Sequence, residues 1–312
     1  MRSSLLLLPG HAVGEALCGV AEEVLTDVAV AFNHSFLIRR DKIGEASVHA
    51  YDTPLTEETV AACAKANAVL LGDTDMDGAD DLLQALDIPC KTRTFSLKDA
   101  RRFYIVQTAS LDVKTLGDAM QHAYELAKEE ELPLSYVSPS GKAAMDFKAA
   151  VRVRERDYVS VITTELSPPK AVNKLLYSPE ELGVLVVPPY AGSMLNTMAT
   201  AVYGASMMLF DACESRKRFV YAPVVSEDAE ADDSLNPIGM VLASAQLLRN
   251  ALHLEREADC VDAAVRNVLA AGWRTPDMAG SGSAIGGKQI LRLILEQIEL
   301  AGELLSPQGG NR

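Results

Sequence analysis

Short apolar runs alternate along the chain with longer segments in which apolar residues recur every three or four positions. A short run of β-branched or aliphatic residues is typical of a buried strand, and the longer recurrence is typical of an amphipathic helix. Strands are predicted at SLLLLPG (4–10), NAVLLG (67–72), PLSYVSP (133–139), YVSVITTELS (158–167), VLVVP (184–188) and RFVYAPVV (218–225). Helices are predicted at 14–28, 111–131, 142–156, 193–202, 236–255, 256–272 and 288–300. Another helix is predicted to start within 51–66, where TPLTEE offers a threonine cap followed by acids in the first turn. This alternation predicts an α/β fold whose twisted, largely parallel sheet is flanked by helices.

Composition and charge narrow the class of protein. The 312 residues are 48% hydrophobic, 23% charged and 5% aromatic, which is enough apolar material for one large or two medium domains. The formal net charge of -14 argues against binding to nucleic acid or to an anionic membrane. The apolar run before Pro9 is too short for a signal peptide or a membrane span, and the five scattered cysteines indicate free, mostly buried thiols. We therefore expect a cytoplasmic protein.

Two further motifs suggest binding sites, each with a simpler explanation. DTDMDGADDLLQ (73–84) spaces Asp73, Asp75 and Asp77 like a calcium loop, but its twelfth position is Gln84 and not glutamate. GSAIGGK (282–288) has the spacing of a phosphate loop, but no strand precedes it and no Ser or Thr follows it. We expect a solvated acidic loop at the first and a flexible connection at the second, although the acidic loop at 73–81 leaves cation binding open.

His11 and one cluster of basic residues are the other candidates for ligand binding. His11 lies between the first predicted strand and the first helix, where ligands of α/β proteins often bind. A basic cluster is formed by Lys91, Arg93, Lys98, Arg101 and Arg102, which we expect either to be solvated or to hold an anion.

The junction LGVLVVPPYAGSMLNTMATAVYG (182–204) reads as a buried strand, a loop PYAG and a helix that starts near Ser193. Ser193 and Thr197 lie one helical turn apart at the start of that helix. Ser193 is expected to cap the helix, and Thr197 to bond to a backbone carbonyl of its own helix.

Three stretches of the chain resemble the isocitrate and isopropylmalate dehydrogenases. They are LLLLPGHAVGEALCGVAEEVL (5–25), DTPLTEETVAACAKANAVLLG (52–72) and the segment from Asn236 to Ile298, which includes RTPD. The resemblance implies an isopropylmalate dehydrogenase-like two-domain fold, with a first domain of residues 1–95 and 203–312 and a middle domain of 96–202. It also implies a homodimer built from middle-domain helices, and a reaction that oxidises a 2-hydroxy acid with NAD or NADP and decarboxylates it at a divalent metal.

The catalytic residues that the resemblance implies are largely replaced. The family's metal aspartates fall on Pro169, Ser193 and Thr197, which cannot supply three carboxylates to Mg²⁺ or Mn²⁺. Its general-base lysine falls on Pro139, with Lys142 three residues further on, and its catalytic tyrosine falls on Ala109.

The substrate and cofactor positions are altered as well. Leu83 replaces one substrate arginine, Arg93 keeps another, and the β arm that holds a third is largely deleted before the helix at 111–131. Asn236 of the NAD-binding segment is kept, but the preceding loop is the acidic SEDAEADD (226–233), whose carboxylates disfavour a pyrophosphate.

Two hypotheses follow from this pattern. The first is a family member that performs no metal-dependent oxidative decarboxylation, binds no Mg²⁺ or Mn²⁺, and binds NAD weakly or not at all. It would bind a small anionic metabolite through Arg93, as a homodimer or as a regulatory partner of an active paralogue. The second is an NAD-dependent dehydrogenase, or a related metabolite-processing enzyme, with a divergent site drawn from His11, Lys142, Tyr190, Ser193 and Thr197.

Overall fold

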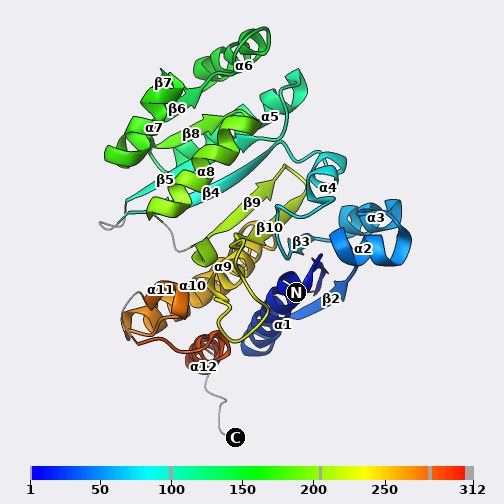
Figure 1. Ribbon diagram of the computed structural model, residues 1–312. Coiled ribbons are helices and arrows are strands. Elements are labelled where there is room, and N and C mark those ends of the chain that lie inside the picture. The colour runs from blue at the N-terminus through cyan, green and yellow to red at the C-terminus, as the bar shows by residue number, and fades with distance from the viewer. Residues whose placement is uncertain (1, 98–100, 204–205, 280–282, 306–312) are drawn as a thin grey trace, which may run out of the picture. The chain divides into compact units, whose positions relative to one another are not determined.

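The predicted α/β fold is confirmed in the computed structural model, whose ten strands form a mostly parallel sheet flanked by helices (Figure 1). The structure describes residues 2–97, 101–203, 206–279 and 283–305. The chain forms two compact units. Unit 1 comprises Met1–Leu82, Ala205–Ala212 and Arg218–Arg312, and unit 2 comprises Leu83–Gly204 and Cys213–Lys217.

The strands are short, and most are apolar. In chain order they are β1 (Arg2–Leu8), β2 (Ser35–Arg40), β3 (Ala68–Leu71), β4 (Cys90–Ser96), β5 (Arg102–Thr108), β6 (Leu134–Val137), β7 (Thr163–Leu166), β8 (Val184–Val187), β9 (Phe210–Glu214) and β10 (Phe219–Pro223).

The helices of the described residues vary widely in length. They are α1 (Ala12–Ala31), α2 (Gly44–Tyr51), α3 (Glu57–Lys65), α4 (Ala79–Ala85), α5 (Val113–Glu129), α6 (Ala143–Asp157), α7 (Pro168–Tyr177), α8 (Pro189–Tyr203), α9 (Ile238–Gln246), α10 (Glu255–Ala270), α11 (Pro276–Ala279) and α12 (Gly287–Leu305). Three short turns of 3-10 or π helix lie at Pro179–Glu181, Ser206–Met208 and Leu247–Ala251. Among the described helices, none is long and apolar enough to cross a membrane.

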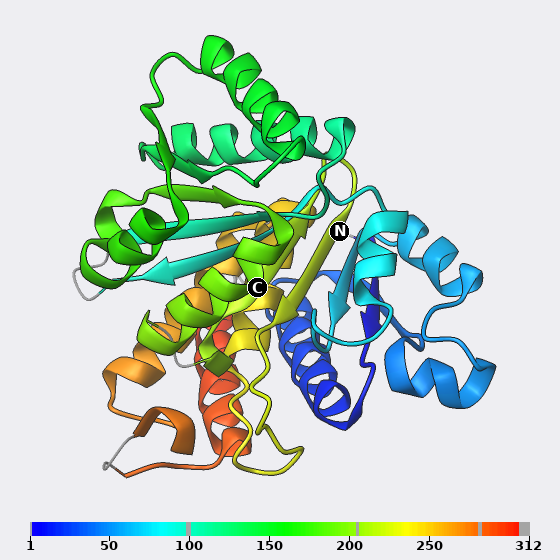
Figure 2. The ribbon, with the colours of Figure 1, turned by 45° about the horizontal axis from the view of Figure 1, so that its top comes forward.

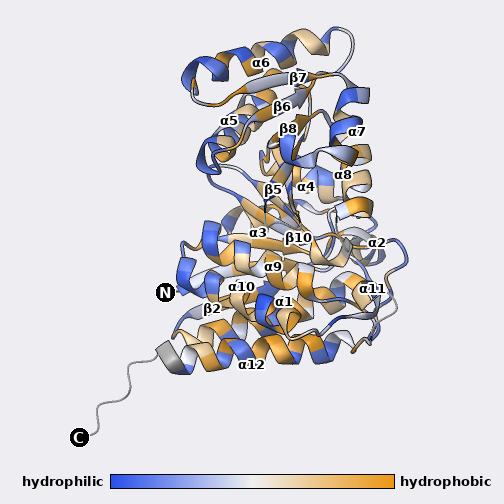
Figure 3. Cartoon of the chain, turned by 90° about the vertical axis from the view of Figure 1, so that its left-hand side faces the viewer, coloured by the Kyte–Doolittle hydropathy of each residue, from blue (hydrophilic) through white to orange (hydrophobic). Residues whose placement is uncertain are grey.

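Unit 1 is built on parallel strands in the order β2-β1-β3-β10. Strand β3 is buried along its whole length, as expected where helices cover both faces of a parallel sheet. Helices α1, α9, α10 and α12 pack on one another, and their apolar faces share one core with β1 and β10. Figure 3 shows hydrophobic and hydrophilic residues alternating along α12, which is the pattern of a helix buried on one side.

Unit 2 contains strands in the order β4-β5-β8-β6-β7. Strand β5 lies between β4, with which it pairs antiparallel, and β8, with which it pairs in parallel (Figures 1 and 2). The pairs β8–β6 and β6–β7 are also parallel. Alternate residues of β4 and β5 face opposite sides of the sheet. Cys90, Tyr104 and Val106 join a core with α5, whereas Arg93 and Gln107 contact α8.

Helix starts follow the local sequence. Thr56 accepts a hydrogen bond from the Thr59 N–H at 3.1 Å, with Glu57 and Glu58 in the first turn, so the predicted threonine cap of α3 is confirmed. Asp112 caps α5 in the same way through the Thr115 N–H at 3.0 Å. Four residues separate the end of β5 from the start of α5, so the chain passes almost directly from strand to helix, as predicted.

The structure adds elements that the periodicity did not indicate. Strand β2 and helix α2 form in a stretch that was left unassigned, and α4 forms within the predicted acidic loop. Strand β4 pairs with β5 in unit 2, whereas the predicted boundary at residue 95 divides the two strands. The predicted domain limits, 1–95 with 203–312 and 96–202, stay a prediction.

Candidate functional site

A polar seam lies in unit 2 between α8 and the strands β4 and β5. We call it the α8 seam and define it as Arg93, Gln107, Ser193, Asn196 and Thr200. Asn196 Nδ2 donates to Gln107 Oε1 at 3.2 Å, and Gln107 Nε2 lies 3.5 Å from Ser193 Oγ. Arg93 Nη1 donates to Thr200 Oγ1 at 3.2 Å. Arg93, Asn196 and Thr200 are all buried, so α8 presents a polar stripe to the strands that it covers.

The close approach of α8 to β5 depends on Gly192. A Cβ atom at Gly192 would lie 2.4 Å from Gln107 Cγ and 2.7 Å from its Oε1. The absent side chain therefore leaves the space that the Gln107 amide fills when it contacts Asn196.

The residues that the resemblance aligns with metal aspartates carry no carboxylate, and the hydroxyls of Ser193 and Thr197 donate to backbone carbonyls of their own helix. Helix α8 begins at Pro189, so PYAG is helical and the predicted loop there is wrong. Ser193 is therefore not a cap: its Oγ donates to the Pro189 carbonyl at 3.3 Å. Thr197 Oγ1 donates to the Ser193 carbonyl at 2.9 Å, as predicted. Pro169 lies exposed in the first turn of α7.

These three residues do not fit a divalent metal ion of the hard, oxygen-preferring kind. Mg²⁺ and Mn²⁺ sites of this type need negatively charged oxygens, and a proline and two neutral hydroxyls supply none. Across the described ranges, no group of three His, Cys, Asp or Glu side chains is placed to hold a metal ion. In the calcium-like loop, Asp73 Oδ1 accepts a hydrogen bond from the Asp75 N–H at 3.0 Å, and α4 begins at Ala79.

The residues that the resemblance aligns with the family's base and acid lie apart from the α8 seam in the chain. Pro139 follows β6, and Lys142 is an exposed residue directly before α6. The backbone N–H of Ala109 donates to the Pro89 carbonyl at 2.8 Å just after β5. Tyr190 lies in the first turn of α8 and is 81% exposed. Neither Lys142 nor Tyr190 contributes a hydrogen bond to the seam among the described residues.

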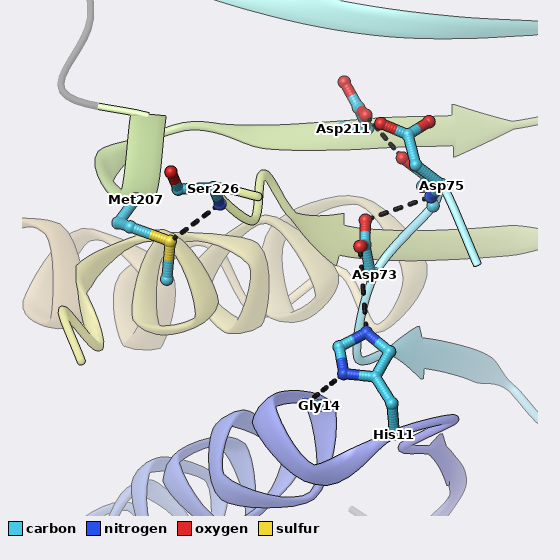
Figure 4. A network of polar contacts seen from close by, with 8 residues as sticks. His11, Gly14, Asp73, Asp75, Met207, Asp211 and Ser226 are labelled. Atoms are coloured by element: carbon cyan, nitrogen blue, oxygen red, sulfur yellow. Dashed lines mark hydrogen bonds and ion pairs between the residues drawn. The ribbon is translucent and has the colours of Figure 1, made fainter. Parts of the chain in front are cut away.

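His11 lies in unit 1, at the carboxyl end of β1, and caps α1 (Figure 4). Its Nδ1 accepts from the Gly14 N–H at 3.3 Å, and its Nε2 lies 3.7 Å from Asp73 Oδ2. Thr74 Oγ1 donates to the buried carboxylate of Asp211 at 2.8 Å beside it. Figure 4 also shows the Ser226 N–H directed at Met207 Sδ, 3.4 Å away. The contacts of His11 assign it a capping role.

The acidic loop 226–235 lies against the start of α12. Asp233 accepts hydrogen bonds from the Gly287 N–H through its carbonyl at 2.7 Å and from the Lys288 N–H through its carboxylate at 3.2 Å. A Cβ atom at Gly286 would lie 1.9 Å from Asp233 Oδ2. The chain's own carboxylate therefore lies where a phosphate loop would bind an anion. Gly282 of the GSAIGGK motif lies outside the described residues.

Asn236 is fully engaged in unit 1. Its Nδ2 donates to Asp277 Oδ2 at 3.0 Å, and its Oδ1 accepts from the Ile238 N–H at 3.0 Å. The side chain is 1% exposed, so these contacts assign it the role of joining the start of α9 to α11.

The basic cluster does not form one exposed patch. Arg93 is buried and Lys91 is half-buried, whereas Arg101 and Arg102 are exposed and Lys98 lies outside the described residues. All five cysteines are free, and four are buried, as predicted. Burial raises the pKa of Cys18, Cys63 and Cys90 to about 12, so these thiols stay protonated at neutral pH.

Gln107, Asn196 and Thr200 were not identified from the sequence. The available signal is the spacing of Asn196 and Thr200, one turn apart on a helix whose other buried positions are apolar or small. Gln107 gives no such signal, because it is one polar residue near the end of a strand and its partners lie more than 80 residues away.

Comparison with known proteins shows similarity to the isocitrate/isopropylmalate dehydrogenases. The model of the isocitrate/isopropylmalate dehydrogenase family matches residues 4–80 and 117–294. The 3-isopropylmalate dehydrogenase of Bacillus subtilis is 28% identical over 339 residues, covering 90% of this chain and 93% of the relative. That of Nitratidesulfovibrio vulgaris is 26% identical over 357 residues, covering 96% of this chain and 100% of the relative.

Solved structures agree at the level of the fold. The isocitrate dehydrogenase from Methylococcus capsulatus superposes with a TM-score of 0.84 at 17% identity, covering 95% of this chain and 99% of that one. A β-decarboxylating dehydrogenase from Thermococcus kodakarensis superposes with a TM-score of 0.81 at 22% identity, covering 99% of both chains.

Proposed function

Because the chain belongs to the isocitrate/isopropylmalate dehydrogenase family, we propose that it keeps this fold but does not perform metal-dependent oxidative decarboxylation. The proposal rests on the side chains at the three positions that the resemblance aligns with metal ligands. Pro169, Ser193 and Thr197 offer no carboxylate, and both hydroxyls donate to backbone carbonyls of α8. Divalent metal supplies the Lewis acid of this reaction class, so a chain without its ligands lacks the group that stabilises the developing charge.

The proposed role is binding of a small anionic metabolite by a cytoplasmic, non-decarboxylating homologue with a regulatory or partner function. Lys91 and Arg93 lie on the face of the β4–β5 pair that α8 covers, and both supply positive charge there. The loop 226–235 and the loop 73–81 carry carboxylates, which supports weak or lost NAD binding.

A homodimer through the middle segment is part of the proposal. Helices α7 and α8 expose large apolar side chains in the single chain, with Tyr177 76%, Tyr190 81%, Met194 52% and Val202 51% exposed. Exposed apolar groups on neighbouring helices are typical of a protein–protein interface. Light scattering of the wild type and of Met194→Glu tests this: we expect a dimer for the wild type and monomers for the variant. A monomeric wild type, or association with an active paralogue alone, would contradict a homodimer.

The test of the main proposal is turnover. We expect no NADH or NADPH formation with 3-isopropylmalate, isocitrate or malate in the presence of Mg²⁺ or Mn²⁺, under conditions where the Bacillus subtilis relative turns over 3-isopropylmalate. Metal-dependent turnover of any of these hydroxy acids would refute the proposal.

The alternative is an enzyme with divergent chemistry, and one observation favours it. His11 Nε2 and the Asp73 carboxylate are 3.7 Å apart at the ends of β1 and β3, which is the arrangement of a histidine supported by an acid. Turnover that is independent of metal and lost in His11→Gln would support this alternative.

A further inference from the structure

Helices α10 and α12 leave an open groove between them on the surface of unit 1. The groove has a volume of about 500 Å³. Its walls carry small or apolar side chains, namely Cys260, Ala263, Ala264, Leu300 and Ala301. Its ends are polar: Arg256 lies at one, and the amides of Asn267 and Gln297, 3.4 Å apart, lie at the other. The stretch of α10 from Arg256 to Asn267 is about 16 Å long, or three helical turns, so the groove can receive one face of a third helix.

The apolar surface extends beyond the walls of the groove. Leu300 lines the groove and is 52% exposed, and Val30, near the end of α1, is 79% exposed. The ends of α1 and α12 meet here, because a Cβ atom at Gly302 would lie 2.6 Å from Ala31 Cβ. Exposed apolar side chains that gather around a groove are typical of a surface that another protein covers.

The charge at the groove indicates what kind of occupant it favours. Arg256 forms no ion pair within the described ranges, and its guanidinium carbon lies 5.8 Å from the centre of the Phe32 ring. Asp259, the acidic residue of the groove, is already bonded to Arg249 at 2.6 Å. An occupant that combines an apolar side chain with a carboxylate therefore complements both the walls and Arg256.

Helix α12 itself presents this combination. Glu296 and Glu303 are exposed and lie one turn before and one turn after Leu300, so both acids share the face of α12 that carries the leucine. One carboxylate therefore points toward Arg256 whichever way a second copy of α12 runs along the groove. Glu296 is paired only with Arg292, at 3.2 Å on the exposed surface, and a pair of this kind contributes little.

We propose that the chain associates with a second copy of itself through this surface, with Leu300 of each copy packed in the α10–α12 groove of the other and a carboxylate of the same helix against Arg256. The contact is isologous, because each copy supplies both the leucine and the groove. It is additional to the α7–α8 interface proposed above, and it does not depend on what the protein binds or catalyses. A contact centred on one groove falls below the roughly 1,200 Å² of a stable interface, so we expect a Kd on the order of 100 µM.

Sedimentation equilibrium of Met194→Glu tests this contact apart from the α7–α8 interface. Between about 5 and about 500 µM protein, we expect a shift from monomer to dimer. If the α7–α8 contact survives the substitution, the same surface gives a shift from dimer to tetramer. Leu300→Asp in this background is expected to weaken the association about tenfold or more, because the leucine is the apolar centre of the contact.

Val48→Asp is the matched control. Val48 is 41% exposed on α2, another helix of unit 1, which lies away from α12 in Figure 1. We expect its Kd for self-association to stay within about twofold of the parent protein. The charges are tested separately: Arg256→Glu should weaken the association, and the further changes Glu296→Arg and Glu303→Arg should restore it by reversing the pair.

The Cys260 thiol reports on occupancy of the groove itself. The other four cysteines are buried, and burial also raises the pKa of Cys260, so its alkylation is followed by mass spectrometry at about pH 9. We expect alkylation to be about threefold slower at about 500 µM than at about 5 µM, because about three quarters of the chains are then associated.

A molar mass that stays constant over this range, or equal effects of Leu300→Asp and Val48→Asp, would overturn the inference. An alkylation rate of Cys260 that does not change with protein concentration would overturn it as well, since the groove would then be empty or filled by its own chain.

Discussion

Gly192→Ala is the sharpest structural test of the α8 seam, because two effects of opposite sign compete there. Alanine is favoured over glycine inside a helix by about 1 kcal/mol. The new Cβ would lie 2.4 Å from Gln107 Cγ, so the glutamine side chain must move away from Asn196. Overpacking costs about 1–3 kcal/mol and the lost amide bond about 1 kcal/mol. The sum predicts a net destabilisation of about 1–3 kcal/mol.

Gly117→Ala in α5 is the matched control. It also lies inside a helix of unit 2, and a Cβ atom there meets nothing within 4 Å. We expect it to stabilise the protein by about 0.5–1 kcal/mol through helix propensity alone. Urea unfolding followed by circular dichroism measures both variants. A Gly192→Ala variant as stable as Gly117→Ala would refute the reasoning, since it would show that Gln107 has room to move at no cost.

Three further predictions concern helix ends and buried polar groups. Hydrogen bonds from Ser110 and Thr115 lower the pKa of Asp112, which caps α5. At pH values above the ordinary carboxyl pKa of about 4, Asp112→Ala should lower the free energy of unfolding in urea by about 1 kcal/mol. This difference in stability between variant and wild type should vanish as the pH falls through the lowered pKa. Asp233→Ala should cost about 1 kcal/mol by removing the carboxylate at the start of α12, with the loss measured by urea unfolding; an unchanged midpoint would contradict the capping role. Burial lowers the pKa of His122, so the wild type should lose stability as the pH falls below about 6.5. The free energy of unfolding of His122→Gln should depend less on pH over the same range. Parallel dependence on pH in the two proteins would contradict this.

The order of strands and helices was predictable because hydrophobic periodicity encodes it directly. Strand β8 and helix α5 illustrate this, since each is a single stretch with one clear period. Strand β2 was missed because its burial alternates only weakly and two arginines end it. This strand forms by pairing with β1, and the hydrophobic pattern of a short stretch does not indicate which distant strand it pairs with.

The start of α8 shows how a local motif can mislead. PYAG contains a proline and a glycine and was interpreted as a loop, with Ser193 as a helix cap. Proline is instead well suited to the first position of a helix, and the glycine is required by the approach of Gln107. The helix therefore begins four residues earlier, and Ser193 becomes an internal residue bonded to Pro189.

The sequence shows that the residues the resemblance aligns with metal ligands carry no carboxylate, but it does not show the polar contacts that surround them. Ser193 and Thr197 are identifiable by resemblance alone. The Gln107–Asn196 contact joins two elements 89 residues apart, and it exists only because β5 and α8 pack face to face. Long-range side-chain pairing of this kind is set by tertiary packing and leaves little local signature.

The central claim is that the residues aligned with the family's metal ligands hold no metal ion. Electron paramagnetic resonance of free Mn²⁺, titrated with the protein in saturating malate, measures this directly. The account predicts no site at one ion per chain, beyond the weak and salt-sensitive binding expected of an acidic surface. A stoichiometric Mn²⁺ site that malate strengthens, and that Ser193→Ala with Thr197→Ala abolishes, would contradict it.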